Sequence, residues 1–526
     1  MLFLWRVVLT TMVGWVMFVL SAVAEDRLTA PERIAIRGSI PADLVEIEIT
    51  YPEGHTPSVS LKGPKSPDFP ALAPTETKID VLVSEKTIVS FGGSTHEAQW
   101  QEHVVHISSQ SLTDRPSGYQ IFLSQPEMSL DVLSYGVLHV QGWTSGPFKL
   151  ALADVAAYQR GDNVFLQQVE GSFDVRFPLR SVARRLDLRR LLSLVLFPQN
   201  PSSTVTVTSL VFERVDKARS YTPALGFWLW NYRNGIAQQD TIIADCQRFA
   251  CTRLFVQLPS EKDPASLWID YVQFLRVIKK SGIEAFAVDG YPEAINNPTP
   301  LLNKLQRLIE LTDDGNLDGI QLDIEPYVLE DFFVDEGGFR RYLSVIDQVR
   351  NVLPKRVRFA IVMPFWFSSQ KVSGRPVAFS VMDRADEVAL MSYRTDVDEL
   401  RALADDSLRY GDMVGSPVWL ALETTPLPLE YHVVLRRTEE RETADAYLDR
   451  KNRNVVFAAP PAEVQGEYFR TQQRFAVRPE RLTFAKEDRQ TVRAAVKTAF
   501  TSTPNPSLAG VIIHDWKGFF ALKARR

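Results

Sequence analysis

Hydrophobic and polar residues follow two different patterns along this chain, and the change between them falls near residue 220. From about Lys78 to Val215, apolar residues alternate with polar ones in short runs that are separated by turn residues. This is the pattern of strands that bury one face. Many short strands at regular spacing, with almost no helical period, predict an all-β sandwich over residues 78–219.

Beyond residue 220, apolar strand-like runs alternate with segments of helical periodicity. Eight such units over about 300 residues have the count and size of a (β/α)8 TIM barrel, so we predict this fold for residues 220–526, with an active site at the carboxyl ends of the strands. The eight predicted strands are Leu225–Trp230, Arg253–Leu258, Ile283–Gly290, Leu317–Tyr327, Arg358–Trp366, Glu387–Tyr393, Val418–Thr424 and Ala509–Trp516.

The first 77 residues are predicted to lie outside both domains. Residues 1–24 have a short n-region that ends in Arg6, an apolar run over residues 7–20 and the small residues Ala22 and Ala24. This predicts a signal peptide and a periplasmic or secreted protein, without membrane contact after cleavage; an uncleaved anchor is the alternative. The proline-rich residues 25–77 predict an extended lead-in with one strand pair around Leu44–Ile49.

Composition narrows the range of partners. The net charge is −5 and no basic tail is present, so nothing favours nucleic acid. The arginine cluster Arg180–Arg190 is predicted to be a solvated face. Cys246 and Cys251 are the only two cysteines; they form a disulfide or a buried thiol pair and cannot complete a zinc site. We expect no metal and no organic cofactor.

The fourth predicted strand, LDGIQLDIEPY over Leu317–Tyr327, carries the main catalytic candidates. A strand would set Asp323 and Glu325 side by side on one face. Two adjacent carboxyl groups disfavour simultaneous ionisation, so one keeps its proton near neutral pH and can act as a general acid, as cleavage of a glycosidic bond requires. The alternatives are a solvated acidic strand end and a calcium-binding loop over Asp314–Glu325, in which Pro326 would interrupt the exiting helix.

Aromatic and polar residues also gather at the ends of the other predicted strands. Aromatic rings stack on sugar rings, while carboxylates and amides bind hydroxyl groups, so this set predicts a polysaccharide or oligosaccharide substrate; for each single aromatic residue, a core or rim position is the alternative. The candidates for substrate binding are Trp228, Trp230, Asp289, Gln321, Tyr327, Trp366, Arg394 and Trp516, and the candidates for catalysis are Glu325, Asp323, Glu423 and Tyr393.

The strand-four stretch resembles the DxxDxDxE signature of the family 18 glycoside hydrolases, the chitinase-like (β/α)8 barrels. Asp318, Asp323 and Glu325 match the first Asp, the third Asp and the acid, whereas Gln321 stands where the family has its second Asp. The resemblance implies a retaining glycoside hydrolase. If the sugar carries a 2-acetamido group, Asp323 would orient it for attack while Glu325 protonates the leaving oxygen.

Two further segments support this resemblance. ALMSYRTD looks like the sixth-strand motif of the family, and VIIHDW looks like its eighth strand. The likeness implies that Tyr393 helps to hold the reacting sugar and that Trp516 forms the floor of the pocket.

Glu423, at the end of VWLALE, introduces a rival interpretation. A Glu after strand four and a Glu after strand seven resemble the pair of the clan A retaining glycosidases, with Glu325 as acid/base and Glu423 as nucleophile, although Ile324 stands where that clan has Asn. We favour a chitinase-like site in which Glu423 orients the substrate or is a second catalytic carboxylate. The replacement at Gln321 also fits a non-catalytic, lectin-like barrel.

Two segments outside the predicted barrel core complete the sequence-based picture. The strand order of residues 78–219 resembles the jelly-roll modules that accompany carbohydrate-active enzymes, which implies a carbohydrate-binding module; a purely structural sandwich is the alternative. The insertion 426–481 is much longer than an ordinary barrel loop and begins next to Glu423. Its aromatic residues and a predicted helix over Thr438–Asn452 favour a lid over the cleft.

Overall fold

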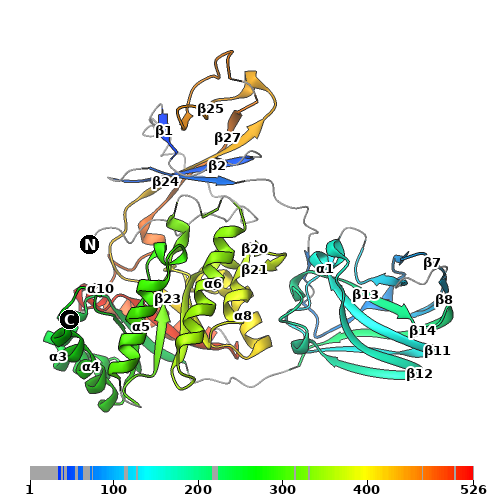
Figure 1. Ribbon diagram of the computed structural model, residues 1–526, viewed down its shortest axis with the longest axis horizontal. Coiled ribbons are helices and arrows are strands. Elements are labelled where there is room, and N and C mark those ends of the chain that lie inside the picture. The colour runs from blue at the N-terminus through cyan, green and yellow to red at the C-terminus, as the bar shows by residue number, and fades with distance from the viewer. Residues whose placement is uncertain are drawn as a thin grey trace.

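The computed structural model contains three structural units: a barrel, a sandwich and a smaller sheet (Figure 1). The predicted signal peptide, residues 1–24, lies outside the described residues. The structure describes residues 33–36, 40, 44–53, 57–62, 71–73, 75–111, 117–125, 128–215, 223–312, 315–329, 332–333, 335–464, 466–502 and 505–524.

The barrel confirms the predicted fold of the second half of the chain. All eight strands pair in parallel and close into a ring. Their residues are almost all apolar, because helices cover the outer face of the barrel and side chains fill its interior. The strands are β15 (Ala224–Leu229), β16 (Arg253–Gln257), β17 (Glu284–Asp289), β18 (Gly319–Leu322), β19 (Arg358–Pro364), β22 (Glu387–Met391), β23 (Val418–Glu423) and β28 (Leu508–His514).

The longer helices around the barrel bury one apolar stripe each, whereas all six residues of α7 are buried. In α5 the stripe consists of Leu301, Leu305 and Leu308, and α8 begins where the Asp396 carboxylate accepts the backbone N–H groups of residues 398 and 399. The helices are α2 (Tyr232–Ala237), α3 (Gln239–Arg248), α4 (Ala265–Lys280), α5 (Thr299–Leu311), α6 (Gly337–Val352), α7 (Val377–Met382), α8 (Val397–Val414), α9 (Arg489–Ser502) and α10 (Trp516–Ala521). In the part of the chain that is described, no helix has both the length and the apolar composition needed to cross a membrane.

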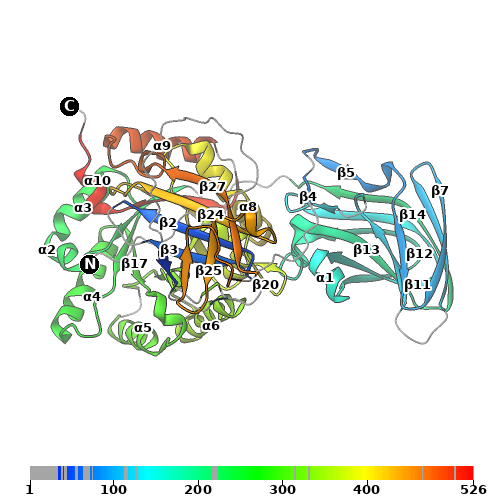
Figure 2. The same ribbon diagram turned by 90° about the horizontal axis from the view of Figure 1, so that it is seen from above.

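The N-terminal sandwich also confirms the predicted class. Its two longest strands are β11 (Val137–Asp154) and β12 (Val164–Pro178), and each spans two of the alternating runs in the sequence. The first part of β11 pairs with β14 (Ser202–Glu213) and its last part with β13 (Leu191–Pro198), so this strand runs through both layers. Figure 2 shows its length. The other elements are β5 (Lys78–Asp80), β6 (Ile88–Phe91), β7 (Ser94–Gln101), β8 (Val104–Ser111), β9 (Gly118–Phe122), β10 (Ser129–Leu130) and the helix α1 (Val155–Arg160).

The third unit confirms the predicted strand pair near Leu44–Ile49, which is β2 (Glu46–Pro52) paired with β3 (Ser58–Lys62), but corrects the rest of the predictions for residues 25–77 and 426–481. Part of the predicted lead-in pairs with the barrel insertion in one seven-stranded sheet, in which Thr50 lies opposite His432. The predicted helix over Thr438–Asn452 is wrong, because these residues form the end of β24 (Glu430–Thr438), a short turn and β25 (Ala446–Asp449). Apolar residues of these strands, such as Leu435 and Leu448, enter the core of this sheet.

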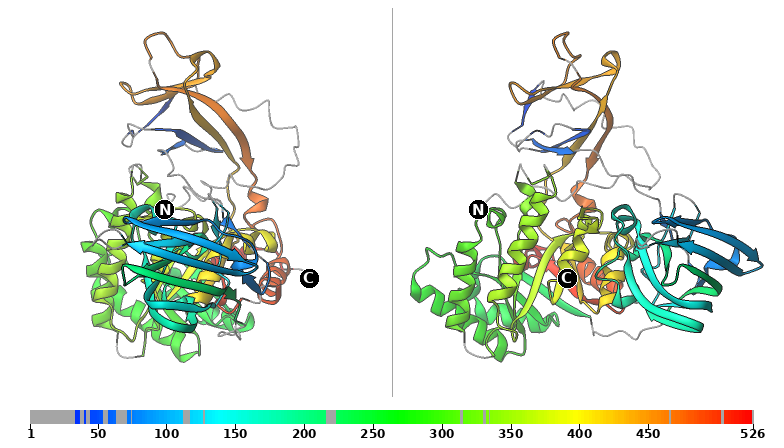
Figure 3. Two further views of the ribbon diagram at one scale, coloured as in Figure 1. Left: turned by 90° about the vertical axis from the view of Figure 1, so that its right-hand side faces the viewer. Right: turned by 45° about the vertical axis from the view of Figure 1, so that its right-hand side comes forward.

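The remaining strands of this small sheet are β1 (Arg33–Ala35), β26 (Asn454–Val456) and β27 (Tyr468–Val477). The sheet stands over the end of the barrel toward which the strands point, as Figures 1 and 3 show from different sides. Since this is the carboxyl end of the strands, the insertion lies on the functional face of the barrel.

The arginine cluster Arg180–Arg190 is not simply a solvated face. The side chain of Arg189 is largely buried; it pairs with Asp187 in the sandwich and with Asp406 on α8. Arg409, also on α8, donates to the carboxylate of Asp131 in the sandwich. These ion pairs join the sandwich to the side of the barrel.

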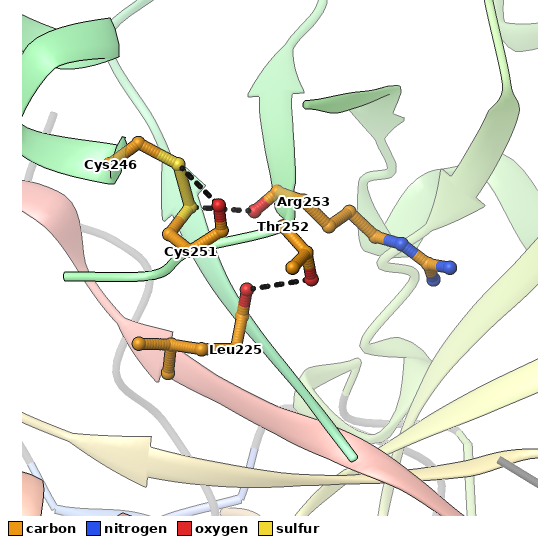
Figure 4. The surroundings of a disulfide bond; sticks show 5 residues. All are labelled: Leu225, Cys246, Cys251, Thr252 and Arg253. Atoms are coloured by element: carbon orange, nitrogen blue, oxygen red, sulfur yellow. Dashed lines mark hydrogen bonds between the residues drawn. A yellow bond between two sulfur atoms is a disulfide. The ribbon is translucent and has the colours of Figure 1, made fainter. Parts of the chain in front are cut away.

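The two cysteines form a disulfide, one of the two alternatives that the sequence left open. Cys246 lies near the end of α3, and Cys251 lies just before β16 (Figure 4). The next residue, Thr252, donates its backbone N–H to the carbonyl oxygen of Leu225 at 2.9 Å, and its hydroxyl, drawn in Figure 4, donates to the same oxygen at 3.4 Å. The bridge therefore fixes the entry to the second barrel strand, at the end of the barrel opposite the catalytic candidates.

Candidate functional site

Asp323 and Glu325 lie just beyond the end of β18 and not within a continuous strand. The strand ends at Leu322, and Glu325 precedes a short 3-10 turn over Pro326–Val328. The Asp323 N–H donates to the carbonyl oxygen of Asp289, on the neighbouring strand, at 2.9 Å. The chain therefore leaves the sheet where the two carboxyl groups stand, and both keep some exposed surface.

A glycine allows this close approach. A Cβ atom on Gly290 would lie 2.1 Å from the carbonyl oxygen of Asp323, a contact that real side chains do not make. Gly290 directly follows β17, so it lets the ends of two adjacent strands come together. It is therefore a positioning residue that the sequence analysis did not select.

The two carboxyl groups have different protonation behaviour. Burial raises the pKa of Asp323 to about 6, and the nearby His514 opposes this rise. Burial, and then the negative charge of Asp323, raise the pKa of Glu325 well above its ordinary value, while the nearby Tyr327 hydroxyl opposes this rise. Near neutral pH this pair therefore favours an ionised Asp323 beside a protonated Glu325.

Buried polar atoms around these carboxyl groups lack hydrogen-bond partners among the described residues. They are Asp323 Oδ1, Trp230 Nε1, Trp366 Nε1 and the hydroxyl of Tyr342 on α6. The charges of Asp323 and Glu325 also act on that hydroxyl. Because a buried polar group without a partner is costly, this arrangement suits water or a polar ligand that supplies the missing hydrogen bonds.

Glu423 is placed differently from the strand-four carboxyl groups. It has no exposed surface, and its Oε1 accepts from the backbone N–H of Thr425 at 2.5 Å and from the Thr425 hydroxyl at 2.7 Å. Its Oε2 lies 2.8 Å from Nδ1 of His514. In this conformation Glu423 has no surface to offer a sugar, which disfavours its predicted roles as a nucleophile or as a substrate-orienting group.

His514 is a residue of the candidate site that was not selected from the sequence. Burial alone would lower its pKa, but the carboxylate of Glu423 outweighs this effect and raises it, with smaller contributions from Asp515 and Asp323. Glu423 and His514 are direct partners in the register of β23 and β28. The pair therefore places a cation within the electrostatic reach of Asp323, and the positions of the two residues at neighbouring strand ends were the available signal.

Gln321 and Trp228 form a buried hydrogen bond inside the barrel. The Trp228 Nε1–H donates to Gln321 Oε1 at 2.6 Å, and both residues are only 1% exposed. Gln321 therefore uses its carbonyl oxygen to satisfy an indole N–H and does not place a charge beside Asp323.

The other aromatic candidates divide by exposure. Three of them are at most 3% exposed: Trp228, Trp366 and Tyr327. In this conformation they pack beneath the surface of the barrel mouth and have almost no surface for a sugar. Trp230 packs against Trp228 with ring centroids 6.1 Å apart. Both Trp230 and Trp516 keep exposed surface. Stacking on a sugar is therefore open to Trp230 and Trp516 without rearrangement.

The remaining polar candidates have protein partners. Asp289 pairs with Lys304 at 2.5 Å, and Arg394 lies 3.5 Å from Glu399. Burial, followed by the charges of the three carboxyl groups at residues 423, 323 and 325, raises the pKa of Tyr393 well above its usual value. Tyr393 therefore keeps its phenolic proton and can donate it in a hydrogen bond.

No metal centre is evident in the described portion of the chain, where no three His, Cys, Asp or Glu side chains are grouped to hold an ion. The calcium-loop alternative is wrong, because residues 319–322 of that loop form barrel strand β18 and hydrogen-bond to β17 and β19. Asp318, the first Asp of the motif, pairs with Lys279 at 2.5 Å and accepts the N–H of Ala285. It therefore stabilises the start of the strand, away from the carboxyl end.

Comparison with known proteins gives no family assignment. No protein-family model matches the chain, and no curated protein sequence matches it. Among solved structures, a chitinase from Bacteroides thetaiotaomicron is 14% identical, with 56% of this chain and 90% of that chain covered and a TM-score of 0.32. The spore cortex-lytic enzyme SleL from Bacillus cereus is 12% identical, with 64% and 78% covered and a TM-score of 0.33.

A third similar structure contains the CBM22-1 and GH10 modules of the Clostridium thermocellum xylanase 10B. It is 9% identical, with 84% of this chain and 91% of that chain covered and a TM-score of 0.28. These values are too low to carry a functional argument. The assignment of a function therefore rests on the geometry of the barrel site.

Proposed function

We propose that this protein is a glycoside hydrolase that acts on a polysaccharide or oligosaccharide, with Glu325 as the general acid. The observation that carries this proposal is the pair Asp323 and Glu325 at the carboxyl end of a barrel strand, where burial and mutual repulsion favour a single shared negative charge. Such a pair provides one group that can protonate a leaving oxygen and one that can stabilise positive charge.

Asp323 is the proposed assisting carboxylate, and Tyr393 is the proposed hydrogen-bond donor to the reacting sugar. The burial of Glu423 disfavours a direct retaining pair formed by Glu325 and Glu423. The proposed mechanism is therefore retention with assistance from the substrate, in which a 2-acetamido oxygen attacks the anomeric carbon and Asp323 orients the amide. In this mechanism Glu325 protonates the leaving oxygen and then deprotonates the incoming water.

The proposal is tested by incubating the full chain, and its Glu325→Gln variant, with a panel of neutral, acidic and N-acetylated oligosaccharides. The expected result is product release from at least one N-acetylated substrate by the wild type and none by the variant, at equal binding affinity. Tight binding by both proteins without any product would instead support the lectin-like alternative.

A further inference from the structure

A pocket of about 530 Å³ lies between the sandwich and the barrel, apart from the barrel mouth. Its sandwich wall comes from α1 and the segment 184–187. Its barrel wall comes from α6, α7 and the hairpin of β20 (Lys371–Val372) and β21 (Arg375–Pro376). Figures 1 and 2 both show α1 beside this hairpin.

The charge of this pocket is unusual for a chain of net charge −5. Six arginines and four aspartates line it, which leaves an excess of positive charge. The aspartates are already engaged by the protein: Asp187 with Arg189, Asp383 with Arg375, Asp347 with Arg384, and Asp154 with the backbone N–H groups of Ala157 and Asp187. The negative side chains are therefore committed to the junction itself.

The arginines on the pocket walls fall into two groups. Arg375, Arg384 and Arg340 are engaged by Asp383, Asp347 and Glu336, whereas the other three are held more loosely. Arg185 is exposed and forms no side-chain ion pair or hydrogen bond with the described residues. The Arg184 side chain is 61% exposed and lies 3.7 Å from Asp383. The Arg160 side chain is 48% exposed, lies 3.8 Å from Asp162 and donates one N–H to the carbonyl oxygen of Ser373 at 3.2 Å. Exposed pairs at such distances contribute little, so these guanidinium groups are available to a ligand.

Guanidinium groups recognise planar oxyanions because their N–H donors match two acceptor oxygens. The hydroxyl-bearing residues Ser344, Ser373 and Ser380 also line the pocket and can bind neutral hydroxyl groups. The hairpin follows barrel strand β19, so it lies on the same face of the barrel as Glu325. A ligand here would contact both domains without occupying the catalytic candidates.

We infer that this pocket is a second, non-catalytic binding site for an acidic saccharide, whose carboxylate or sulfate groups bind Arg184, Arg185 and Arg160. The anionic character of the ligand is argued from the arginines alone, whereas the choice of a saccharide rests on the proposed function. The prediction that Arg180–Arg190 is a solvated face is thereby refined, since two of its members line a pocket between domains.

The test measures binding by isothermal titration calorimetry on the full chain carrying Glu325→Gln, so that no ligand is cleaved. The ligands are oligogalacturonate, heparin fragments, carboxyl-reduced oligogalacturonate as the neutral match, and inorganic phosphate. The double change Arg184→Ala and Arg185→Ala is compared with Arg180→Ala, which removes an exposed arginine of the same segment that does not line the pocket.

The expected result is binding of at least one acidic oligosaccharide that weakens with salt and is absent for the neutral match. Its Kd should rise by about tenfold or more in the double variant and remain unchanged in Arg180→Ala. Binding of phosphate without any acidic oligosaccharide, or equal effects of the two arginine changes, would overturn the inference.

The pocket inference and the proposed hydrolase function can fail independently of each other. Arginine-dependent binding with no cleavage of any glycan by the wild type would leave the pocket assignment intact and refute the hydrolase. Cleavage of a glycan with no arginine-dependent binding of an acidic saccharide would support the hydrolase and refute the pocket assignment.

Discussion

The ends of strands β18 and β23 both carry acidic residues at the barrel mouth, yet their surroundings give them opposite properties. Asp323 and Glu325 keep exposed surface, and one oxygen of Asp323 lacks a partner among the described residues. Glu423 is fully buried and is bonded to Thr425 and His514. The position at a strand end thus predicts where a carboxylate lies, whereas its partners decide whether it can act on a ligand.

The largest expected effect comes from Glu325→Gln. The loss of the transferable proton should lower kcat by about 10²–10⁴-fold on a glycan that the wild type cleaves. The folded-state pKa of Glu325 is raised, so its ionisation costs stability as the pH rises above the unfolded value near 4.5. The variant should therefore unfold at the same or a higher temperature than the wild type at pH 7. A loss of both activity and thermal stability would assign Glu325 a structural role.

Glu423→Gln, in contrast, should mainly lower the stability of the folded protein. Breaking a buried ion pair costs about 3–5 kcal/mol when the remaining charge stays buried, and less here because His514 can lose its proton. The ion pair stabilises the folded protein below the raised pKa of His514, and this stabilisation is lost as the pH rises through that value. Thermal unfolding at pH 6 and pH 9 should show a larger deficit at pH 6. Equal stability of variant and wild type at pH 6 would refute this role.

The pH dependence of kcat/KM tests whether the Glu423–His514 pair acts on Asp323. Activity should fall below about pH 6 as Asp323 gains a proton, and again at high pH as Glu325 loses one. In Glu423→Gln, His514 loses the partner that raises its pKa, so its charge no longer lowers the pKa of Asp323. The acidic limb should then move to higher pH. An unshifted limb would mean that the pair does not act on Asp323.

A smaller effect is expected at Gln321. Gln321→Leu leaves the buried Trp228 N–H without its acceptor, which should cost about 1–3 kcal/mol in the free energy of unfolding. Gln321→Glu keeps an acceptor and serves as the matched control for the hydrogen bond, although it adds a charge near Asp323. Denaturant unfolding of both variants checks this role. Unchanged stability of Gln321→Leu relative to the wild type would show that the bond is unimportant for stability.

The barrel and the sandwich could be predicted because their strands carry the necessary pattern locally. Seven of the eight barrel strands lie within about two residues of their predicted ends, whereas the regular part of strand four stops at Leu322, before the carboxyl groups. The small sheet could not be predicted, since Thr50 and His432 lie 382 positions apart and neither segment has a complete hydrophobic face of its own. Many charges at residues 436–442 also resembled a solvated helix.

The candidate site was predicted in part, for a similar reason. Asp323 and Glu325 share one motif, so their proximity follows from the sequence. The pairing of Glu423 with His514 depends on the closure of the barrel, which brings β23 beside β28. The burial of Trp228 and Trp366 depends on neighbours from several strands, which a single motif does not reveal.

Varying the leaving group of the substrate tests directly whether Glu325 donates a proton to it. Two glycosides of the same sugar, one with a good leaving group such as a nitrophenol and one with a sugar, should be compared in the wild type and in Glu325→Gln. A good leaving group needs no proton, so the account predicts that the variant cleaves the nitrophenyl glycoside at close to the wild-type rate in a single turnover and fails on the oligosaccharide. Equal losses on both substrates would contradict it.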